Sequence, residues 1–292
     1  MNNFEYYAPD SLQEALASLE KFGQKARILA GGTDLIAQMK AGRVQPSIII
    51  DVKKIAELNR LELSADNTIH IGAAVPLSKI TAFPAVIQQF RILHQGCSLI
   101  GSDRIRNRGT MGGNICNAAP SADSAPALLC LGARAIIAQS KGNRIVPLQD
   151  FFQGPGRTVI APDELLVEIE IPASPKFSAG SYLRHTPREE MDIAVAGVAV
   201  FLVLNPNSNK CQEARIALGA VAPIPVRVPQ AEAILAGNIL NKAVIEKAAE
   251  AAATAASPIS DIRSSADYRR ELVKVLTRRA LENTCDALDI RI

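Results

Sequence analysis

The residues best suited to chemistry in this sequence lie in two short glycine-rich segments. The first is Ala-Gly-Gly-Thr-Asp at residues 30–34, and the second is Thr-Met-Gly-Gly-Asn at residues 110–114. Adjacent glycines permit positive φ angles and let another group approach the backbone closely. Backbone N–H groups can then converge on an anion, helped by the N-terminus of a following helix. Two such segments closing from opposite sides would suit a diphosphate, whereas each pair of glycines taken alone could equally be a tight turn.

Neither segment matches a known single-loop phosphate signature. G-x-x-x-x-G-K-[ST] is absent, and no G-x-G-x-x-G follows a predicted strand, which disfavours ATP hydrolysis and Rossmann-type NAD binding. A carboxylate would repel a phosphate, so Asp34 is expected to cap a helix or form a turn. Asp123 could cap a helix, or it could accept hydrogen bonds from sugar or ribityl hydroxyls. The basic run Arg104, Arg106 and Arg108 fits a solvated face, a phosphate contact or a partner contact, and the sequence does not choose among them.

Cysteine and histidine indicate little further chemistry. The number of cysteines is odd and no two have the C-x-x-C spacing, which disfavours disulfides, zinc sites and iron–sulfur clusters. No two of the three histidines have metal-ligand spacing, so metal or histidine catalysis is poorly supported. The cysteines expected to be buried or partly buried free thiols are Cys97, Cys116, Cys130, Cys211 and Cys285.

The composition points to a folded protein of two domains. The chain has 292 residues, which is longer than a domain with a single hydrophobic core usually is. Hydrophobic residues make up 48% of it, which is enough for a substantial core. Its 32 Lys and Arg nearly balance 29 Asp and Glu, which argues against a nucleic-acid surface. No apolar run approaches the roughly 20 residues of a membrane span. The first residues lack the charged-then-apolar pattern of a secretion signal, so a cytoplasmic location is expected.

The spacing of apolar residues predicts alternating helices and strands in the first part of the chain. A helix should start after Asp10 or Ser11 and stop at Gly23. Residues 101–117, rich in Gly, Asn and Arg, predict a long functional loop without regular structure. The other expected elements are strands at 26–30, 47–51, 61–63, 68–71, 133–139, 144–146 and 165–171, and helices at 35–40, at 76–99 with a break near Pro84, and from Ser121 or Asp123 to about Leu131.

Beyond a linker at residues 173–175 the pattern changes to strands followed by helices. This order predicts an α+β domain with a three-stranded sheet covered on one face. The strands are expected at 182–185, 193–204 and 214–221, and the helices at 229–236, 241–256 and 265–284.

Residues 30–34, 105–114 and 120–126 together resemble the FAD-binding subunit of molybdenum hydroxylases. This family comprises the medium subunits of xanthine dehydrogenase, carbon monoxide dehydrogenase and related aldehyde or N-heterocycle dehydrogenases, and the xanthine dehydrogenase subunits look closest. The similarity continues, in order, through residues 154–158, 163–166, 191–194 and 217–223. It implies an α+β protein with a vanillyl-alcohol-oxidase-type (PCMH-type) FAD-binding domain at 1–174, in lobes of about 1–57 and 58–174. A small carbon monoxide dehydrogenase flavoprotein C-terminal-like domain would follow at 175–292.

The resemblance also implies where FAD would lie between the two lobes. Residues 27–34 would line the diphosphate on one side and residues 109–113 on the other. Asn114 and Asp123 would hold ribityl or ribose hydroxyls, and Leu165 would pack near the adenine. Ile100 would lie near the flavin ring, and Arg184 stands where relatives often have Lys, a cation that could stabilise reduced flavin. The residues so assigned are Arg27, Ile28, Leu29, Ala30, Gly31, Gly32, Thr33, Asp34, Ile100, Gly109, Thr110, Met111, Gly112, Gly113, Asn114, Asp123, Leu165 and Arg184. Non-covalent FAD is expected, because neither segment contains His and the nearest thiol, Cys116, lies just past the second.

The family context implies two partner subunits. A large subunit would hold the molybdenum cofactor and hydroxylate the substrate, and a small subunit would hold two [2Fe–2S] clusters. Electrons would pass from molybdenum through the clusters to FAD and then to NAD or another acceptor, in a dimer of heterotrimers. Some relatives insert a cysteine-rich segment for a [4Fe–4S] cluster; this sequence lacks one, so no metal is expected on this chain.

Two other functions stay open from the sequence. One is a free-standing FAD-dependent oxidoreductase with its own substrate pocket, although the second domain offers no clear acid–base pair for it. The other is a nucleotide-binding scaffold without redox chemistry.

Overall fold

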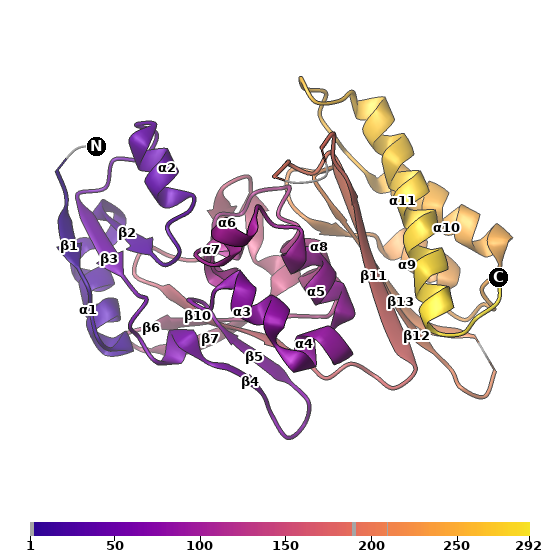
Figure 1. Ribbon diagram of the computed structural model, residues 1–292, viewed down its shortest axis with the longest axis horizontal. Coiled ribbons are helices and arrows are strands. Elements are labelled where there is room, and N and C mark those ends of the chain that lie inside the picture. Colours follow the sequence, from indigo (N-terminus) through magenta and orange to yellow (C-terminus); the bar gives the residue numbers. More distant parts are fainter. Residues whose placement is uncertain (1–2, 189–190, 209) are drawn as a thin grey trace.

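The computed structural model describes residues 3–188, 191–208 and 210–292, and it begins with a small parallel sheet in the order β1-β3-β2 (Figure 1). The Ser11 side chain accepts a hydrogen bond from the Glu14 N–H and Gly23 ends the helix at φ 51°, so the predicted ends of α1 are confirmed. All four residues of the central strand β3 are buried, as its continuous apolar run predicts. The elements are β1 (Glu5–Tyr7), α1 (Leu12–Phe22), β2 (Ala26–Leu29), α2 (Leu35–Lys40) and β3 (Ile48–Asp51).

A five-stranded antiparallel sheet follows, in the order β4-β5-β10-β6-β7. The central strand β10 pairs with β5 on one side and β6 on the other, with an irregularity between Leu166 and Glu168. Its strands are β4 (Leu61–Leu63), β5 (Ile69–Gly72), β6 (Arg134–Gln139), β7 (Gly142–Pro147) and β10 (Leu165–Ile171), and a separate small hairpin is formed by β8 (Phe152–Gly154) and β9 (Arg157–Thr158).

Short helices lie over one face of this sheet (Figure 1). The predicted break at Pro84 is confirmed, because α3 ends before it and Pro84 is the first residue of α4. The prediction that residues 101–117 lack regular structure is wrong. Two short helices form there because the side chains of Ser102 and Thr110 cap them, in a composition that otherwise disfavours helix. The helices are α3 (Leu77–Ala82), α4 (Pro84–Gln89), α5 (Arg91–Ser98), α6 (Asp103–Arg106), α7 (Met111–Cys116) and α8 (Ser124–Cys130).

The last part of the chain forms an antiparallel sheet in the order β11-β12-β13-β14. The expected three strands are present, and a fourth, β14, adds two residues beside β13, too few to leave a pattern in the sequence. Three helices cover one face, as expected (Figure 1). The elements are β11 (Ser178–His185), β12 (Ala196–Leu204), β13 (Cys211–Gly219), β14 (Val226–Arg227), α9 (Pro229–Leu235), α10 (Lys242–Ala255) and α11 (Ala266–Ala287).

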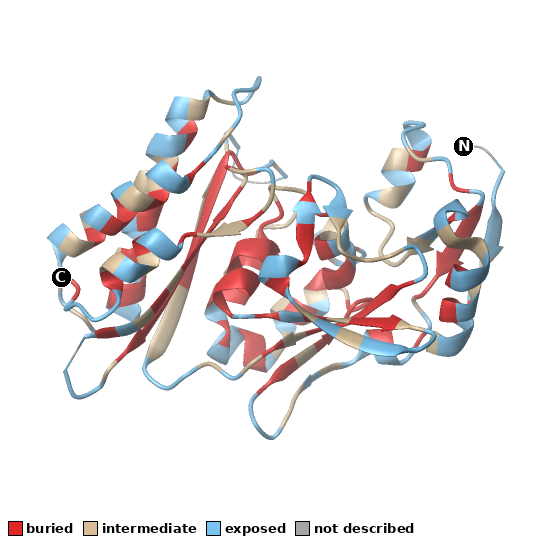
Figure 2. Ribbon diagram, turned by 180° about the vertical axis from the view of Figure 1, so that it is seen from behind, coloured by how far each residue is buried: buried red, intermediate tan, exposed pale blue. Residues whose placement is uncertain are grey.

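The other face of this C-terminal sheet is also covered. Helices α5 and α8 pack against β11, β12 and β13, and every residue of β12 is buried (Figure 2). The first part of the chain and the C-terminal sheet are therefore joined by a closely packed interface. Within the described ranges, none of the helices is both long and apolar enough to span a bilayer.

Candidate functional site

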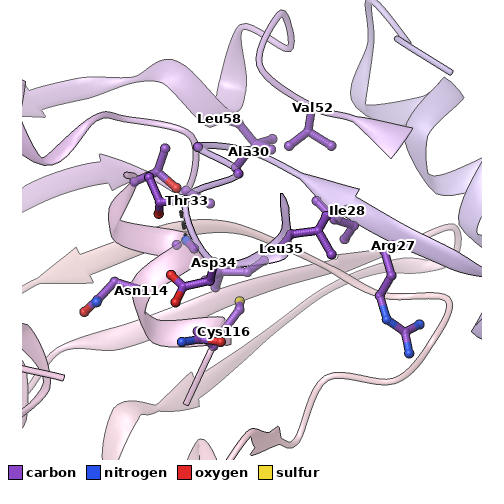
Figure 3. Close-up of a pocket in the computed structure, with 18 of the residues that line it drawn as sticks. Arg27, Ile28, Ala30, Thr33, Asp34, Leu35, Val52, Leu58, Asn114 and Cys116 are labelled. Carbon is purple, nitrogen blue, oxygen red and sulfur yellow. Dashed lines mark hydrogen bonds between the residues drawn. The ribbon is translucent and has the colours of Figure 1, made fainter. Parts of the chain in front are cut away.

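Both glycine segments line one cavity of about 460 Å³ (Figure 3). This volume is in the range of small-molecule sites. The first segment connects β2 to α2, and the second opens α7, so the cavity lies between the parallel sheet and the helices over the five-stranded sheet. Of the residues assigned from the sequence, those that line it are Arg27, Ile28, Ala30, Gly31, Gly32, Thr33, Asp34, Ile100, Thr110, Gly112, Gly113, Asn114 and Leu165. Those outside its lining are Leu29, Gly109, Met111, Asp123 and Arg184.

The first segment presents unpaired backbone donors. Gly32 has a positive φ of 76°, and in the described part of the chain the N–H groups of Gly32, Thr33 and Asp34 donate to no carbonyl or side chain. The Asp34 side chain, which precedes α2, makes no capping hydrogen bond. Three consecutive free N–H groups on a cavity wall suit an anionic ligand.

Gly31 serves the contact between the two segments. A Cβ on Gly31 would lie 2.1 Å from the Arg108 carbonyl oxygen, which is backbone and cannot rotate away. Only glycine therefore allows the turn after β2 to reach the residues that lead into α7.

The second segment works differently from the prediction. Positive φ was expected for Gly112 and Gly113, but both lie in the first turn of α7 without it. Their N–H groups donate to the Ala73 carbonyl at 3.1 Å and to Thr110 Oγ1 at 3.0 Å. A Cβ on Gly112 would lie 2.5 Å from that of Ala73, so this glycine permits close packing of α7. The donors of this segment that have no protein acceptor in the described chain include the Thr110 N–H and the Asn114 side-chain amide.

Asp123 and Arg184 form a buried ion pair between the two parts of the chain. Arg184 Nη1 lies 2.6 Å from Asp123 Oδ2, and the Tyr182 hydroxyl donates to Oδ1 at 2.7 Å. The two charged side chains are only 6% and 8% exposed. Burial raises the pKa of Asp123 to about 6, against the lowering effects of the Arg184 charge and the Tyr182 hydrogen bond. Asp123 precedes α8 but makes no side-chain cap, so its carboxylate serves the contact with β11.

The three arginines of the basic run have separate surroundings. Arg106 donates to the Ile100 carbonyl at 3.0 Å and pairs with Asp103, so it holds the backbone of a residue that lines the cavity. Arg104 and Arg108 are exposed.

Several lining residues were not predicted, because most of them are apolar residues that the sequence does not distinguish from ordinary core residues, and the others are isolated polar residues outside any motif. They are Leu35, Gln38, Val52, Leu58, Ala73, Leu77, Ile105, Cys116, Asn117, Thr158, Ile160 and Leu166. All five cysteines are free, and four are buried as expected, but Cys116 is exposed at the cavity wall.

One ion pair holds the segment after β9 against the cavity. The Glu164 carboxylate accepts hydrogen bonds from Arg144 Nε and Nη2, both at 2.7 Å, and from the Ala161 N–H at 2.8 Å. Thr158, before this turn, and Leu165, after it, line the cavity. The Arg144 guanidinium lowers the pKa of Glu164 below its usual range.

Glu164→Gln is expected to destabilise the protein by roughly 1–2 kcal/mol near neutral pH, since it weakens a charged hydrogen-bond pair that is partly open to solvent. Because the folded-state pKa of Glu164 is lowered, this stabilisation is present above the unfolded value and is lost as the pH falls through the folded value. Denaturant unfolding of both proteins between pH 7 and 3 should show the difference shrinking. Glu20→Gln, at an exposed position of α1, is the control and should change little. A difference as large at pH 3 as at pH 7 would contradict this account.

A second cluster of ionisable groups lies outside the cavity lining. Ligand atoms of His70, Glu168 and Glu170 lie within 4.8 Å of one another, a proximity that β5 and β10 create and that sequence spacing hides. Both carboxylates already have cationic partners, Arg60 for Glu168 and Arg134 for Glu170. The cluster is therefore explained as an ion-pair network on the sheet.

Comparison with known proteins is consistent along the whole chain. Residues 2–174 match a model described as the FAD binding domain in molybdopterin dehydrogenase, and residues 181–284 match the CO dehydrogenase flavoprotein C-terminal domain. The chain is 34% identical over 278 residues to the carbon monoxide dehydrogenase medium chain of Hydrogenophaga pseudoflava, covering 95% of this chain and 96% of the other. It is 33% identical over 283 residues to a putative xanthine dehydrogenase FAD-binding subunit of Escherichia coli K12, covering 97% and 96%.

Solved structures agree with these matches. A chain of carbon monoxide dehydrogenase from Hydrogenophaga pseudoflava superposes with a TM-score of 0.93 at 33% identity, covering 98% of both chains. A chain of quinoline 2-oxidoreductase from Pseudomonas putida 86 superposes with a TM-score of 0.91 at 32% identity, again covering 98% of both. The similarity thus includes both the cavity and the C-terminal sheet.

Proposed function

This chain belongs to the family of FAD-binding medium subunits of molybdenum hydroxylases, and we propose that it carries electrons through FAD within such a complex. The electrons would come from [2Fe–2S] clusters on a small subunit, which receives them from the molybdopterin-binding large subunit. They would leave to NAD or another acceptor. A xanthine-dehydrogenase-like complex, arranged as a dimer of heterotrimers, is the proposed assembly.

The cavity suits FAD in the chemistry of its walls. Free N–H groups at Gly32, Thr33 and Asp34 would hold the diphosphate from one side, and the Thr110 N–H and the Asn114 amide would hold it or the adjoining hydroxyls from the other. Apolar side chains also line the cavity, with Ile28 and Val52 near the first segment and Leu77, Ile100 and Ile105 near the second. Leu165 of β10 lines it as well. When bound, FAD supplies the exchange of electrons between one-electron and two-electron partners.

Individual contacts with FAD are proposed from the family resemblance. We propose that Leu165 packs against the adenine and Ile100 against the flavin ring, each at the cavity wall. The resemblance implies roles for Asp123 and Arg184 at FAD, but both lie outside the cavity lining and pair with each other, so their proposed role is to hold the C-terminal sheet against the start of α8. The family matches to 2–174 and 181–284 support a division into domains 1–174 and 175–292.

The observation that carries the proposal is the convergence of both glycine segments on one cavity. Its test is co-purification of the chain with its partners and analysis of the bound cofactors. We expect FAD on this chain, released when the protein is denatured, with molybdenum and iron on the other subunits. NADH should reduce the flavin of the isolated chain, whereas organic substrates should reduce it only when the partners are present. Reduction by an organic substrate without partners would instead indicate a free-standing oxidoreductase.

A further inference from the structure

A buried serine contacts the cavity wall from behind. Ser124, the first residue of α8, is completely buried, and its Oγ donates a hydrogen bond to Asn114 Oδ1 at 2.6 Å. Asn114 lies on α7 and lines the cavity, and Figure 3 shows its side chain among the lining residues. In the described part of the chain, Asn114 Nδ2 has no acceptor.

The direction of this hydrogen bond follows from what a buried hydroxyl needs. A carboxamide has one donor end and one acceptor end, and rotation by 180° exchanges them. Asn114 Oδ1 is the one side-chain partner of Ser124 among the described residues. If Ser124 accepted from Nδ2 instead, its own proton would be buried without an acceptor, which is unfavourable because the hydroxyl loses its hydrogen bonds to water. The serine therefore donates and occupies the amide oxygen.

We infer that Ser124 is a positioning residue that turns the NH2 group of Asn114 toward the cofactor. This inference rests on the proposed function, because it takes FAD to be the ligand of the cavity. The NH2 group then meets an acceptor oxygen of FAD, a phosphate oxygen or the lone pair of a hydroxyl. Fixing the amide before binding removes a rotational cost that a freely turning side chain would have on binding.

The C-terminal sheet holds Ser124 in place. The preceding residue, Asp123, is bound on β11 by both Tyr182 and Arg184. The backbone there is packed closely too, since a Cβ on Gly96 of α5 would lie 2.6 Å from the Asp123 carbonyl oxygen. A continuous set of contacts thus runs from β11 through the start of α8 to the cavity wall.

The test is a double-mutant cycle in the full-length chain, with the FAD dissociation constant measured by flavin fluorescence. Ser124→Ala should weaken FAD binding about three- to tenfold, the usual effect of one hydrogen bond. Asn114→Ala should weaken it at least as much, and the double variant should bind no more weakly than Asn114→Ala alone, because Ser124 acts only through Asn114. Ser181→Ala is the matched control: its buried Oγ has no hydrogen-bond partner, and FAD binding should not change.

Asn114→Asp tests the orientation independently of any Ser124 variant. The carboxylate keeps the Ser124 contact through one oxygen and turns the other oxygen, an acceptor with negative charge, toward FAD. It should therefore bind FAD more weakly than Asn114→Ala, and wild-type affinity in Asn114→Asp would overturn the inference.

The positioning role of Ser124 and the FAD site itself can be disproved separately. Suppose that Asn114→Ala weakens FAD binding, but Ser124→Ala has no effect or adds its full effect to that of Asn114→Ala in the double variant. The positioning role is then wrong, and the FAD site is still supported. If the wild-type chain binds no FAD, or both Asn114 variants bind it normally, the proposed site is wrong and the positioning role falls with it.

Discussion

Gly31→Ala is expected to weaken FAD binding strongly, on the order of a hundredfold, with little change in overall fold. The added Cβ would lie 2.1 Å from the Arg108 carbonyl oxygen, so the two segments must move apart. Bringing the two segments back together around FAD would force the added Cβ against the Arg108 backbone, and such overpacking typically costs about 1–3 kcal/mol. FAD content after purification and the dissociation constant of the refilled protein measure the effect.

Gly237→Ala is the control for this experiment. Gly237 has a φ of 79° with open space around its Cβ position, and it lies between β13 and α10, away from the cavity. Alanine there introduces backbone strain without touching the site, so FAD binding should be kept. Gly112→Val should resemble Gly31→Ala, because its side chain would meet Ala73. Normal FAD content in both cavity variants would show that this cavity is not the cofactor site.

Arg184→Met is expected to destabilise the folded chain by roughly 3–5 kcal/mol, the usual cost of removing one partner of a buried ion pair and leaving the other charge unpaired. Asp123 would remain buried without its cation, and its pKa would rise further, because the Arg184 charge now lowers it. Denaturant unfolding at neutral pH measures the loss.

Two further variants separate charge from packing. Arg184→Lys keeps a cation and should retain most of the stability. In Arg184→Met combined with Asp123→Asn no charge is left unpaired, so part of the loss should be recovered. A double variant as unstable as Arg184→Met alone would show that packing of the arginine, and not pairing with Asp123, holds the two parts together.

The ends of helices could be predicted from the sequence wherever a single nearby residue, such as a capping serine, a glycine or a proline, determines them. The Ser11 cap, the Gly23 stop and the break at Pro84 each depend on residues within one helical turn. Helix α6 was missed because it has only four residues, and α7 was missed because its glycines and asparagine disfavour helix. The hydroxyls of Ser102 and Thr110 cap these two helices.

The details of the cavity depend on contacts that no local pattern reveals. The glycine pairs are visible in the sequence, but which of their N–H groups stay free is decided by partners such as Ala73, far along the chain from Gly112. In the same way, the pairing of Asp123 with Arg184 appears only once the C-terminal sheet packs against α5 and α8. Assignments made by resemblance name the residues without showing these partners.

The placement of the cavity between two separately built layers has a consequence for the life of the protein in the cell. One wall belongs to the parallel sheet and the other to the helices over the five-stranded sheet, so a molecule touching both resists their separation. A ligand present at 100 times its dissociation constant stabilises the folded chain by about 2.7 kcal/mol. Newly made chains that have not acquired flavin would open more often and be degraded first, which would match the amount of the subunit to the vitamin supply.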